Sequence, residues 1–221
     1  MTFHVVRLAT PLSALRTRIN QSAFWAVNTE SDRSSAYSGP VTKSSSAVLG
    51  LGTMGLGMAG QLLDAGFDVA GYNRTTSRAE PLRARGLRSC SDPVSAVEGQ
   101  DAVVVCVADD AALRGVLLES GALDAIPAGA LLLDTGTTSL ALTEELDRLA
   151  REREIRFLDA PITGSKLGAE GGTLTFMVGG PEERVDAARS LFEAMGRHVV
   201  HAGSRVGDGQ RVKHCLNMTQ A

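Results

Sequence analysis

Five glycines crowd the segment AVLGLGTMGLGMAG, residues 47–60, and this segment constrains the fold more than any other. A short apolar run precedes the glycines, and a stretch with helical periodicity follows them, with Met58, Leu62 and Leu63 on one face. A single turn from a strand into a helix does not require so many glycines. We therefore predict that another group approaches this backbone so closely that a Cβ atom would be in the way.

The first three glycines have the spacing Gly50-x-Gly52-x-x-Gly55. Between a strand and a helix this spacing is typical of dinucleotide binding: Gly50 permits the turn, Gly52 lets a pyrophosphate approach, and Gly55 lets helix and strand pack. Free N–H groups at the helix start would bind the phosphates. The alternative is a loop that only needs positive φ angles. The predicted cofactor-binding turn comprises Gly50, Leu51, Gly52, Thr53, Met54 and Gly55.

Apolar runs and helical stretches alternate along the chain after residue 45. We predict buried strands at residues 47–50, 67–73, 101–108, 129–136, 155–161, 173–180 and 197–203. Helices are predicted at residues 54–65, 77–86, 109–118, 139–154 and 181–195, and again from residue 208. The alternation predicts an α/β fold over residues 46–206, a Rossmann-like, doubly wound and mostly parallel sheet with helices on both faces.

Residues 1–45 differ from the rest of the chain. They are rich in Arg and Ser, and their only acidic residues are Glu30 and Asp32. We predict a disordered extension, or a start codon assigned too early. An organellar targeting segment is the alternative.

Composition excludes several classes of function. A formal net charge of −3 provides no basic field to bind nucleic acid, and no apolar run reaches the ~18 residues that span a bilayer. The three cysteines, Cys90, Cys106 and Cys215, lie far apart and fit neither a CxxC nor a metal-ligand spacing. We therefore predict a cytoplasmic protein with free thiols and no metal site.

The residues after the second predicted strand indicate which dinucleotide binds. NAD sites place an Asp or Glu about 20 residues after the glycine turn, where it binds the ribose 2′-OH. This chain has Asn73 there, followed by Arg74 and Thr75. A guanidinium attracts a 2′-phosphate that a carboxylate would repel. We predict that NADP(H) is preferred and that NAD(H) is a second candidate. The alternative is that Arg74 is a solvated side chain at a strand end.

The segment GDGQRVKHCLN, residues 207–217, places Gly209, Lys213 and Asn217 on one helix face. Gly209 leaves room beside the lysine, and Lys213 and Asn217 would both point at one small polar ligand. On spacing alone, a solvated lysine is the better interpretation.

The glycine-rich segment DAPITGSKLGAEGGTL, residues 159–174, follows another predicted strand. Its backbone N–H groups would suit a carboxylate. The alternative for Thr163 and Ser165 is that both are ordinary turn residues.

Four segments resemble, in order and spacing, the signature segments of the β-hydroxyacid dehydrogenases: GLGTMGLGMA, DTGTTS, DAPITGSKLGAEGGTLTFMVGG and GDGQRVKHCLN. This family includes 3-hydroxyisobutyrate dehydrogenase, tartronate semialdehyde reductase and glyoxylate/succinic semialdehyde reductase. The resemblance covers residues 47–221, and four motifs in register make it far more specific than the glycine turn alone. The sequences TGSK and NRT are closest to the glyoxylate/succinic semialdehyde reductase branch.

The resemblance implies a role for each motif. The glycine turn would bind the pyrophosphate, Val107 and Ala108 would lie along the cofactor, and Thr137 would sit near the nicotinamide. Lys213 matches the catalytic lysine, and Asn217 matches the asparagine that supports it. The implied substrate-binding residues are Thr163, Gly164, Ser165 and Lys213, and the implied catalytic residues are Lys213, Asn217 and Thr163.

The resemblance thus implies an NADP(H)-dependent oxidoreductase with Lys213 as general acid/base. It would interconvert a small β-hydroxyacid and its semialdehyde or keto acid, of the 3-hydroxyisobutyrate, tartronate semialdehyde, glyoxylate or succinic semialdehyde class. The full-length form would be a homo-oligomer without nucleic-acid or membrane partners. Family members continue into an all-helical C-terminal domain, so residues 207–221 are predicted to be the start of a truncated interdomain helix. The alternative is a non-catalytic NADP-binding module, or a fragment without an intact active site.

Overall fold

A computed structural model describes residues 44–219, so the predicted leader lies outside the described residues except at its last two positions. The strands in this range are β1 (Ser45–Leu49), β2 (Asp68–Tyr72), β3 (Arg88–Cys90), β4 (Ala102–Val105), β5 (Leu131–Asp134), β6 (Arg156–Asp159), β7 (Ile162–Thr163), β8 (Leu174–Gly179) and β9 (Gly196–Gly203). The α-helices are α1 (Thr53–Asp64), α2 (Glu80–Arg83), α3 (Pro93–Val97), α4 (Asp110–Arg114), α5 (Ala122–Ala125), α6 (Leu140–Glu152), α7 (Lys166–Glu170), α8 (Glu182–Ala187), α9 (Arg189–Met195) and α10 (Asp208–Thr219). In none of these described helices is there a stretch long and apolar enough to cross a bilayer.

Parallel strands form most of the sheet, in the order β3-β2-β1-β4-β5-β6. β8 pairs antiparallel with β6 and with β7, and it pairs parallel with β9. The predicted doubly wound, mostly parallel α/β sheet is therefore confirmed. The winding direction changes between β1 and β4, and in such sheets the ligand crevice lies outside the carboxyl ends of the strands at this point.

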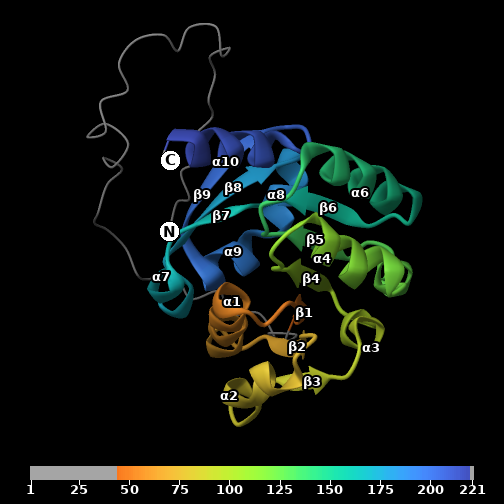
Figure 1. The fold of residues 1–221 in the computed structure, drawn as a ribbon, viewed down its shortest axis with the longest axis vertical. Helices are drawn as coiled ribbons and strands as arrows, with labels where there is room; N and C mark the ends of the chain where they lie inside the picture. The colour runs from red at the N-terminus through yellow and green to blue at the C-terminus, as the bar shows by residue number, and fades with distance from the viewer. Residues whose placement is uncertain (1–43, 220–221) are drawn as a thin grey trace, which may run out of the picture.

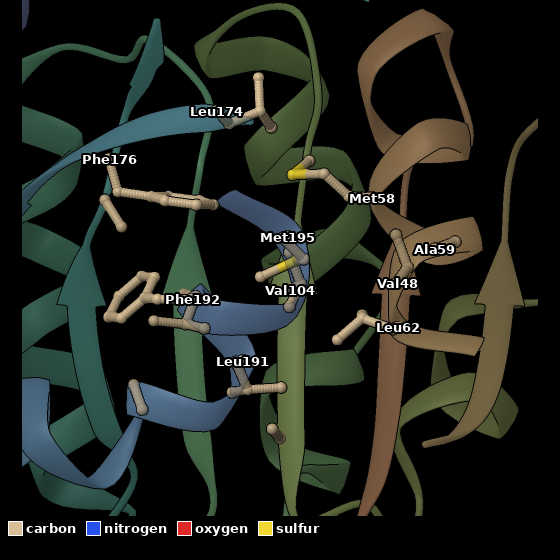
Figure 2. Packing of buried hydrophobic residues seen from close by; sticks show 14 of the residues in the cluster. Val48, Met58, Ala59, Leu62, Val104, Leu174, Phe176, Leu191, Phe192 and Met195 are labelled. Carbon is tan, nitrogen blue, oxygen red and sulfur yellow. The ribbon is translucent and has the colours of Figure 1, made fainter. Parts of the chain in front are cut away.

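Helices cover both faces of the sheet (Figure 1). One buried cluster joins the sheet to α1, α2, α8 and α9, and a second joins it to α3, α4, α5 and α6. Figure 2 shows the first cluster, where Met58 and Leu62 of α1 and Met195 of α9 gather around Val104 of β4. The preceding residue of that strand, Val103, enters the second cluster. Because both faces of the central strands β4 and β5 are buried, these strands are almost entirely apolar.

Two predicted helices are wrong in detail. The helix predicted at residues 181–195 is two helices, because Ala188 between α8 and α9 has a non-helical ψ of 3°. The helix predicted at residues 77–86 is a 3₁₀ turn, Thr76–Ala79, followed by α2. Pro81 lies in the first turn of α2, where its missing N–H has no helical partner to lose.

The short elements β3, β7, α3, α5 and α7 were not predicted. Each has five residues or fewer, so none contains enough of a periodic pattern to be recognised. A π-helical turn, Gly115–Glu119, also follows α4 without a break.

The carboxyl ends of the parallel strands meet at one edge of the sheet, and hydrogen bonds join neighbouring ends. Gly50 N donates to Tyr72 O, and Cys106 N donates to Leu49 O, each at 2.8 Å. The loops that follow β1, β2, β4, β5 and β6 therefore emerge side by side. These loops contain most of the predicted site residues.

Candidate cofactor and active site

Two glycines of the turn between β1 and α1 are required by the protein's own backbone. Gly50 has φ +98°, and a Cβ there would overlap Cys106 O and lie 3.1 Å from Val107 Cγ1. A Cβ at Gly55 would overlap Gly50 O. These positions match the predicted tight turn and the predicted close packing of helix on strand.

Gly52 differs from both, because no described neighbour requires a glycine there. Its φ is −73°, which other residues adopt readily, and beyond the adjacent residues of the chain no atom of residues 44–219 lies within 4 Å of the position a Cβ would take. Gly52 is the N-cap of α1, which has no side-chain cap and no acidic residue in its first turn. The positive end of the helix, with N–H groups that no side chain caps, thus lies beside an exposed glycine.

The two remaining glycines of the segment serve packing. A Cβ at Gly57 would lie 2.8 Å from the backbone of Ala169, so α7 packs directly on α1. A Cβ at Gly60 would lie 2.9 Å from Arg85 Nη1, and Arg85 Nη2 donates to Gly60 O at 3.0 Å. No pattern in the sequence predicts either contact, because Ala169 and Arg85 are distant from these glycines in the chain.

Asn73, at the position that commonly carries an acid, holds the glycine turn in place. Its Oδ1 accepts a hydrogen bond from Leu51 N, and its Nδ2 donates to Thr75 O, both at 3.0 Å. Arg74 and Thr75 are exposed beside it. Within residues 44–219, Arg74 has no hydrogen-bond or ion-pair partner, so its guanidinium is available to an anion.

Val107 lies between the glycine turn and the loop after β5. A Cβ at Gly136 would lie 3.0 Å from Val107 O. Val107 is half-buried and Ala108 is exposed, and both follow β4 rather than end it as predicted. The preceding residue, Cys106, packs against the first cluster, and burial raises the pKa of its thiol to about 11, which disfavours the thiolate at neutral pH.

The loop after β5 is anchored by nearly all of its side chains. Thr135 Oγ1 donates to Val105 O at 2.8 Å, Thr138 Oγ1 donates to Asp134 Oδ2 at 2.8 Å, and Ser139 Oγ donates to Asp110 Oδ2 at 2.5 Å. Thr137 is the exception: it is half-buried, and in the described part of the chain its hydroxyl has no hydrogen bond. The predicted nicotinamide-side residue is thus the one whose polar group is left free.

Helix α10 starts on a buried carboxylate. Asp159, at the end of β6, accepts hydrogen bonds from Gly207 N at 2.6 Å and from Gln210 N at 2.8 Å. The interpretation of Gly209 as space beside the lysine is wrong. A Cβ there would overlap Met177 O and lie 2.8 Å from Asp159 Oδ2, so this glycine lets the helix start pack on β8.

Lys213 lies on the second turn of α10 and is half-buried. Among the described residues it has no hydrogen-bond or ion-pair partner, and burial lowers the pKa of its amine. The neighbouring His214 has Nε2 2.9 Å from Thr138 O, which places this helix against the loop that carries Thr137. Asn217, one turn later, is exposed.

Apart from Lys213, the predicted substrate-binding residues lie at the end of β7 and in its connection to α7. Thr163 is half-buried in β7, and Gly164 has φ +139°. Ser165 caps α7, with Oγ accepting from Gly168 N at 3.3 Å, and its hydroxyl proton can still be donated. Because α7 packs on α1, this connection is fixed relative to the glycine turn.

Two buried acids at adjacent strand ends were missed by the sequence argument. Asp134 and Asp159 are register partners on β5 and β6. Burial raises the pKa of Asp134 to about 7, although hydrogen bonds from Thr138 and Gly136 favour its ionised form. Burial likewise raises the pKa of Asp159 to about 6. The sequence signal was an acidic residue directly after each apolar run.

Residues 45–203 match the family described as the NAD binding domain of 6-phosphogluconate dehydrogenase. The chain is 40% identical over 176 residues to the NAD-dependent L-serine dehydrogenase of Pseudomonas aeruginosa, a match that covers 79% of this chain and 59% of that protein. It is 34% identical over 180 residues to a probable mitochondrial 3-hydroxyisobutyrate dehydrogenase of Dictyostelium discoideum, with coverage of 80% and 56%.

A solved structure shares the fold as well. The 3-hydroxyisobutyrate dehydrogenase of Mycobacterium tuberculosis with L-serine matches with a TM-score of 0.76 at 32% identity, over 81% of this chain and 60% of that chain. The chain therefore spans about three fifths of the length of these relatives. Because the family match covers most of the described residues and the fold is shared, the chain belongs to the family of the 6-phosphogluconate dehydrogenase NAD-binding domain, with 3-hydroxyisobutyrate dehydrogenases among its relatives.

Proposed function

We propose that the protein is an NADP(H)-dependent oxidoreductase that interconverts a small β-hydroxyacid and its aldehyde or keto acid. The glycine turn, with Asn73, Arg74 and Thr75, binds the dinucleotide. Lys213 is the general acid/base, supported by Asn217, and Thr163, Gly164 and Ser165 bind the substrate. Val107, Ala108 and Thr137 lie along the cofactor, between the dinucleotide-binding residues and the substrate-binding residues.

The observation that carries the proposal is the open space at Gly52. A glycine needed for its φ angle or for internal packing would resemble Gly50 or Gly55, and Gly52 resembles neither. A close external approach explains it, and the uncapped start of α1 favours an anion there. The family match favours the pyrophosphate of a dinucleotide as this anion.

The chemistry follows from the state of Lys213. When bound, the nicotinamide ring supplies or accepts a hydride. In reduction, negative charge develops on the substrate oxygen, and the Lys213 ammonium donates a proton to it. In oxidation, the neutral amine accepts the hydroxyl proton. Burial favours this second role, because it lowers the pKa of Lys213, and no described carboxylate pairs with the amine to hold the proton on it.

The cofactor preference rests on Arg74. Its exposed guanidinium has no partner among the described residues, and the carboxylate that would repel a 2′-phosphate is replaced by Asn73. The L-serine dehydrogenase relative is NAD-dependent by name, so NAD(H) is the competing cofactor. The names of the relatives favour a substrate with a carboxylate and a hydroxyl at the β position, such as 3-hydroxyisobutyrate or L-serine.

A titration of the 221-residue chain with NADPH and with NADH, followed by nicotinamide fluorescence, tests the proposal. We expect NADPH to bind at least ~10-fold more tightly than NADH. Turnover is then measured with 3-hydroxyisobutyrate, L-serine, tartronate semialdehyde, glyoxylate and succinic semialdehyde. Tight NADPH binding without turnover of any of them would favour a non-catalytic binding module, and no binding of either cofactor would refute the proposal.

A further inference from the structure

Gln210 is fully buried and joins α10 to the loop after β5. Its Oε1 accepts a hydrogen bond from Thr138 N at 3.2 Å. Its Nε2 donates to Gly136 O at 3.0 Å and to Thr138 Oγ1 at 3.1 Å. The amide therefore binds the residues on both sides of Thr137, whose own hydroxyl is free within the described residues.

The same helix carries Lys213 one turn after Gln210. His214, one turn from Gln210 on the same face, makes the further contact to Thr138 O at 2.9 Å. At the helix start, Asp159 accepts from Gln210 N at 2.8 Å. Backbone and side chain of Gln210 thus connect the ends of two neighbouring strands, β5 and β6, with the helix that presents the lysine.

We propose that Gln210 is a positioning residue, which fixes Lys213 relative to Thr137 and so to the reacting face of the bound cofactor. This inference rests on the proposed function, because it assigns the purpose of Gln210 through Lys213. An apolar side chain of equal size would fill the same space, but it would not fix the orientation of α10 relative to the loop. Hydrogen bonds weaken steeply when distance or angle changes, so three of them to one loop determine both the register and the rotation of α10.

Two variants separate positioning from packing. Gln210→Met keeps the volume and removes all three side-chain bonds. Gln210→Glu keeps the shape; its carboxylate accepts from Thr138 N but repels Gly136 O, whereas its protonated form can donate one bond again. Arg211→Gln is the matched control, because Arg211 is the next residue of α10 and its side chain binds Asp208 and Glu144 instead of the loop.

The first readout does not depend on activity. Hydrogen exchange of the 221-residue chain should show at least ~10-fold faster exchange in Gln210→Met, confined to the loop after β5 and to α10. In the same variant, an NMR titration of the Lys213 side chain should show its pKa moving back toward that of a solvated lysine. Arg211→Gln should change neither quantity.

The second readout uses the proposed reaction. We expect Gln210→Met to lower kcat at least ~10-fold while the Kd of NADPH stays within ~2-fold of the wild type. The defect of Gln210→Glu should recede as the pH falls, whereas that of Gln210→Met should not. Because the buried carboxyls of Asp134 and Asp159 also titrate and would interact with the new carboxyl of Gln210→Glu, the wild type and Gln210→Met are measured at each pH as references.

A folded Gln210→Met variant with unchanged α10 exchange and an unchanged Lys213 pKa would overturn the inference. Global unfolding of both variants would also overturn it, because Gln210 would then be a general core residue. Failure of the proposed function has a separate signature: Lys213→Ala would retain turnover, and the exchange and pKa measurements would still decide whether Gln210 positions the helix.

Discussion

Gly52→Ala separates a glycine that serves a ligand from glycines that serve the fold. The backbone of Gly52, at φ −73°, accommodates alanine, and apart from its neighbours in the chain the new methyl group meets no described atom within 4 Å. Alanine is a poorer N-cap than glycine by up to ~1 kcal/mol, and it restricts the unfolded chain by a similar amount in the opposite direction. We therefore expect the free energy of unfolding to stay within about 1 kcal/mol of the wild type.

Binding should respond very differently, because the methyl group occupies the space into which the pyrophosphate must fit. We expect NADPH to bind at least ~10-fold more weakly, a loss of ~1.4 kcal/mol or more. Gly50→Ala is the matched control for the fold. It adds strain at φ +98° and an overlap with Cys106 O, so it should lower the free energy of unfolding by more than ~2 kcal/mol.

The assay pairs urea unfolding with NADPH fluorescence titration for both variants. We expect stability and affinity to separate, so that Gly52→Ala loses affinity for NADPH at a nearly unchanged free energy of unfolding. If Gly52→Ala bound NADPH as tightly as the wild type, no ligand would lie against this turn. If Gly52→Ala were as unstable as Gly50→Ala, the inference that open space surrounds residue 52 would be wrong.

Four further outcomes are expected. Lys213→Ala should lower turnover at least ~100-fold in steady-state assays and leave the Kd of NADPH unchanged; equal turnover would remove its acid/base role. Arg74→Ala should weaken NADPH by ~1–3 kcal/mol in fluorescence titrations and leave NADH nearly unaffected; equal losses would remove the NADP(H) preference. Since burial raises the pKa of Asp134 to about 7, its stabilising contribution is complete below pH ~4 and is lost as the pH rises to ~7. Between pH ~4 and pH ~7, urea melts should therefore show a smaller fall in the free energy of unfolding for Asp134→Asn than for the wild type, by at most ~4 kcal/mol. An equal fall in both proteins would contradict the burial argument. Glu154 has φ 57° after α6, so Glu154→Gly should raise the free energy of unfolding by ~0.5–1 kcal/mol in urea melts. A decrease would mean that the interactions of the Glu154 side chain outweigh the backbone strain that glycine relieves.

The parts of the fold that the sequence predicts are those that depend on neighbours in the chain. The glycine turn, the apolar strands and the start of α6 at Ser139 are local patterns. Ser139 caps that helix with Oγ accepting from Leu142 N, as a serine before an apolar periodic stretch predicts. The break at Ala188 has no such local pattern, since alanine is a strong helix former.

The missed parts of the site depend on contacts between distant segments. Gln210 and Thr138 are 72 residues apart, and Asp159 and Gly207 are 48 residues apart. Gly209 shows the same limit, because its position beside Lys213 on the helix suggested room for the lysine. Its actual neighbour is β8, and no spacing within α10 contains that information.

The candidate site is best defined by the groups that the described protein leaves unsatisfied. Most polar side chains of the loop after β5 are bound internally, and so are the start of α10 and the amide of Asn73. The N–H groups at the start of α1 have no side-chain cap, and Arg74, Thr137 and Lys213 have no partner within residues 44–219. All of them lie at, or are docked against, the same edge of the sheet. Thr137 and Lys213 are half-buried, and since polar groups without partners are costly to bury, these two favour a polar ligand at this edge. The exposed Arg74 and the uncapped start of α1 would suit the anionic groups of such a ligand.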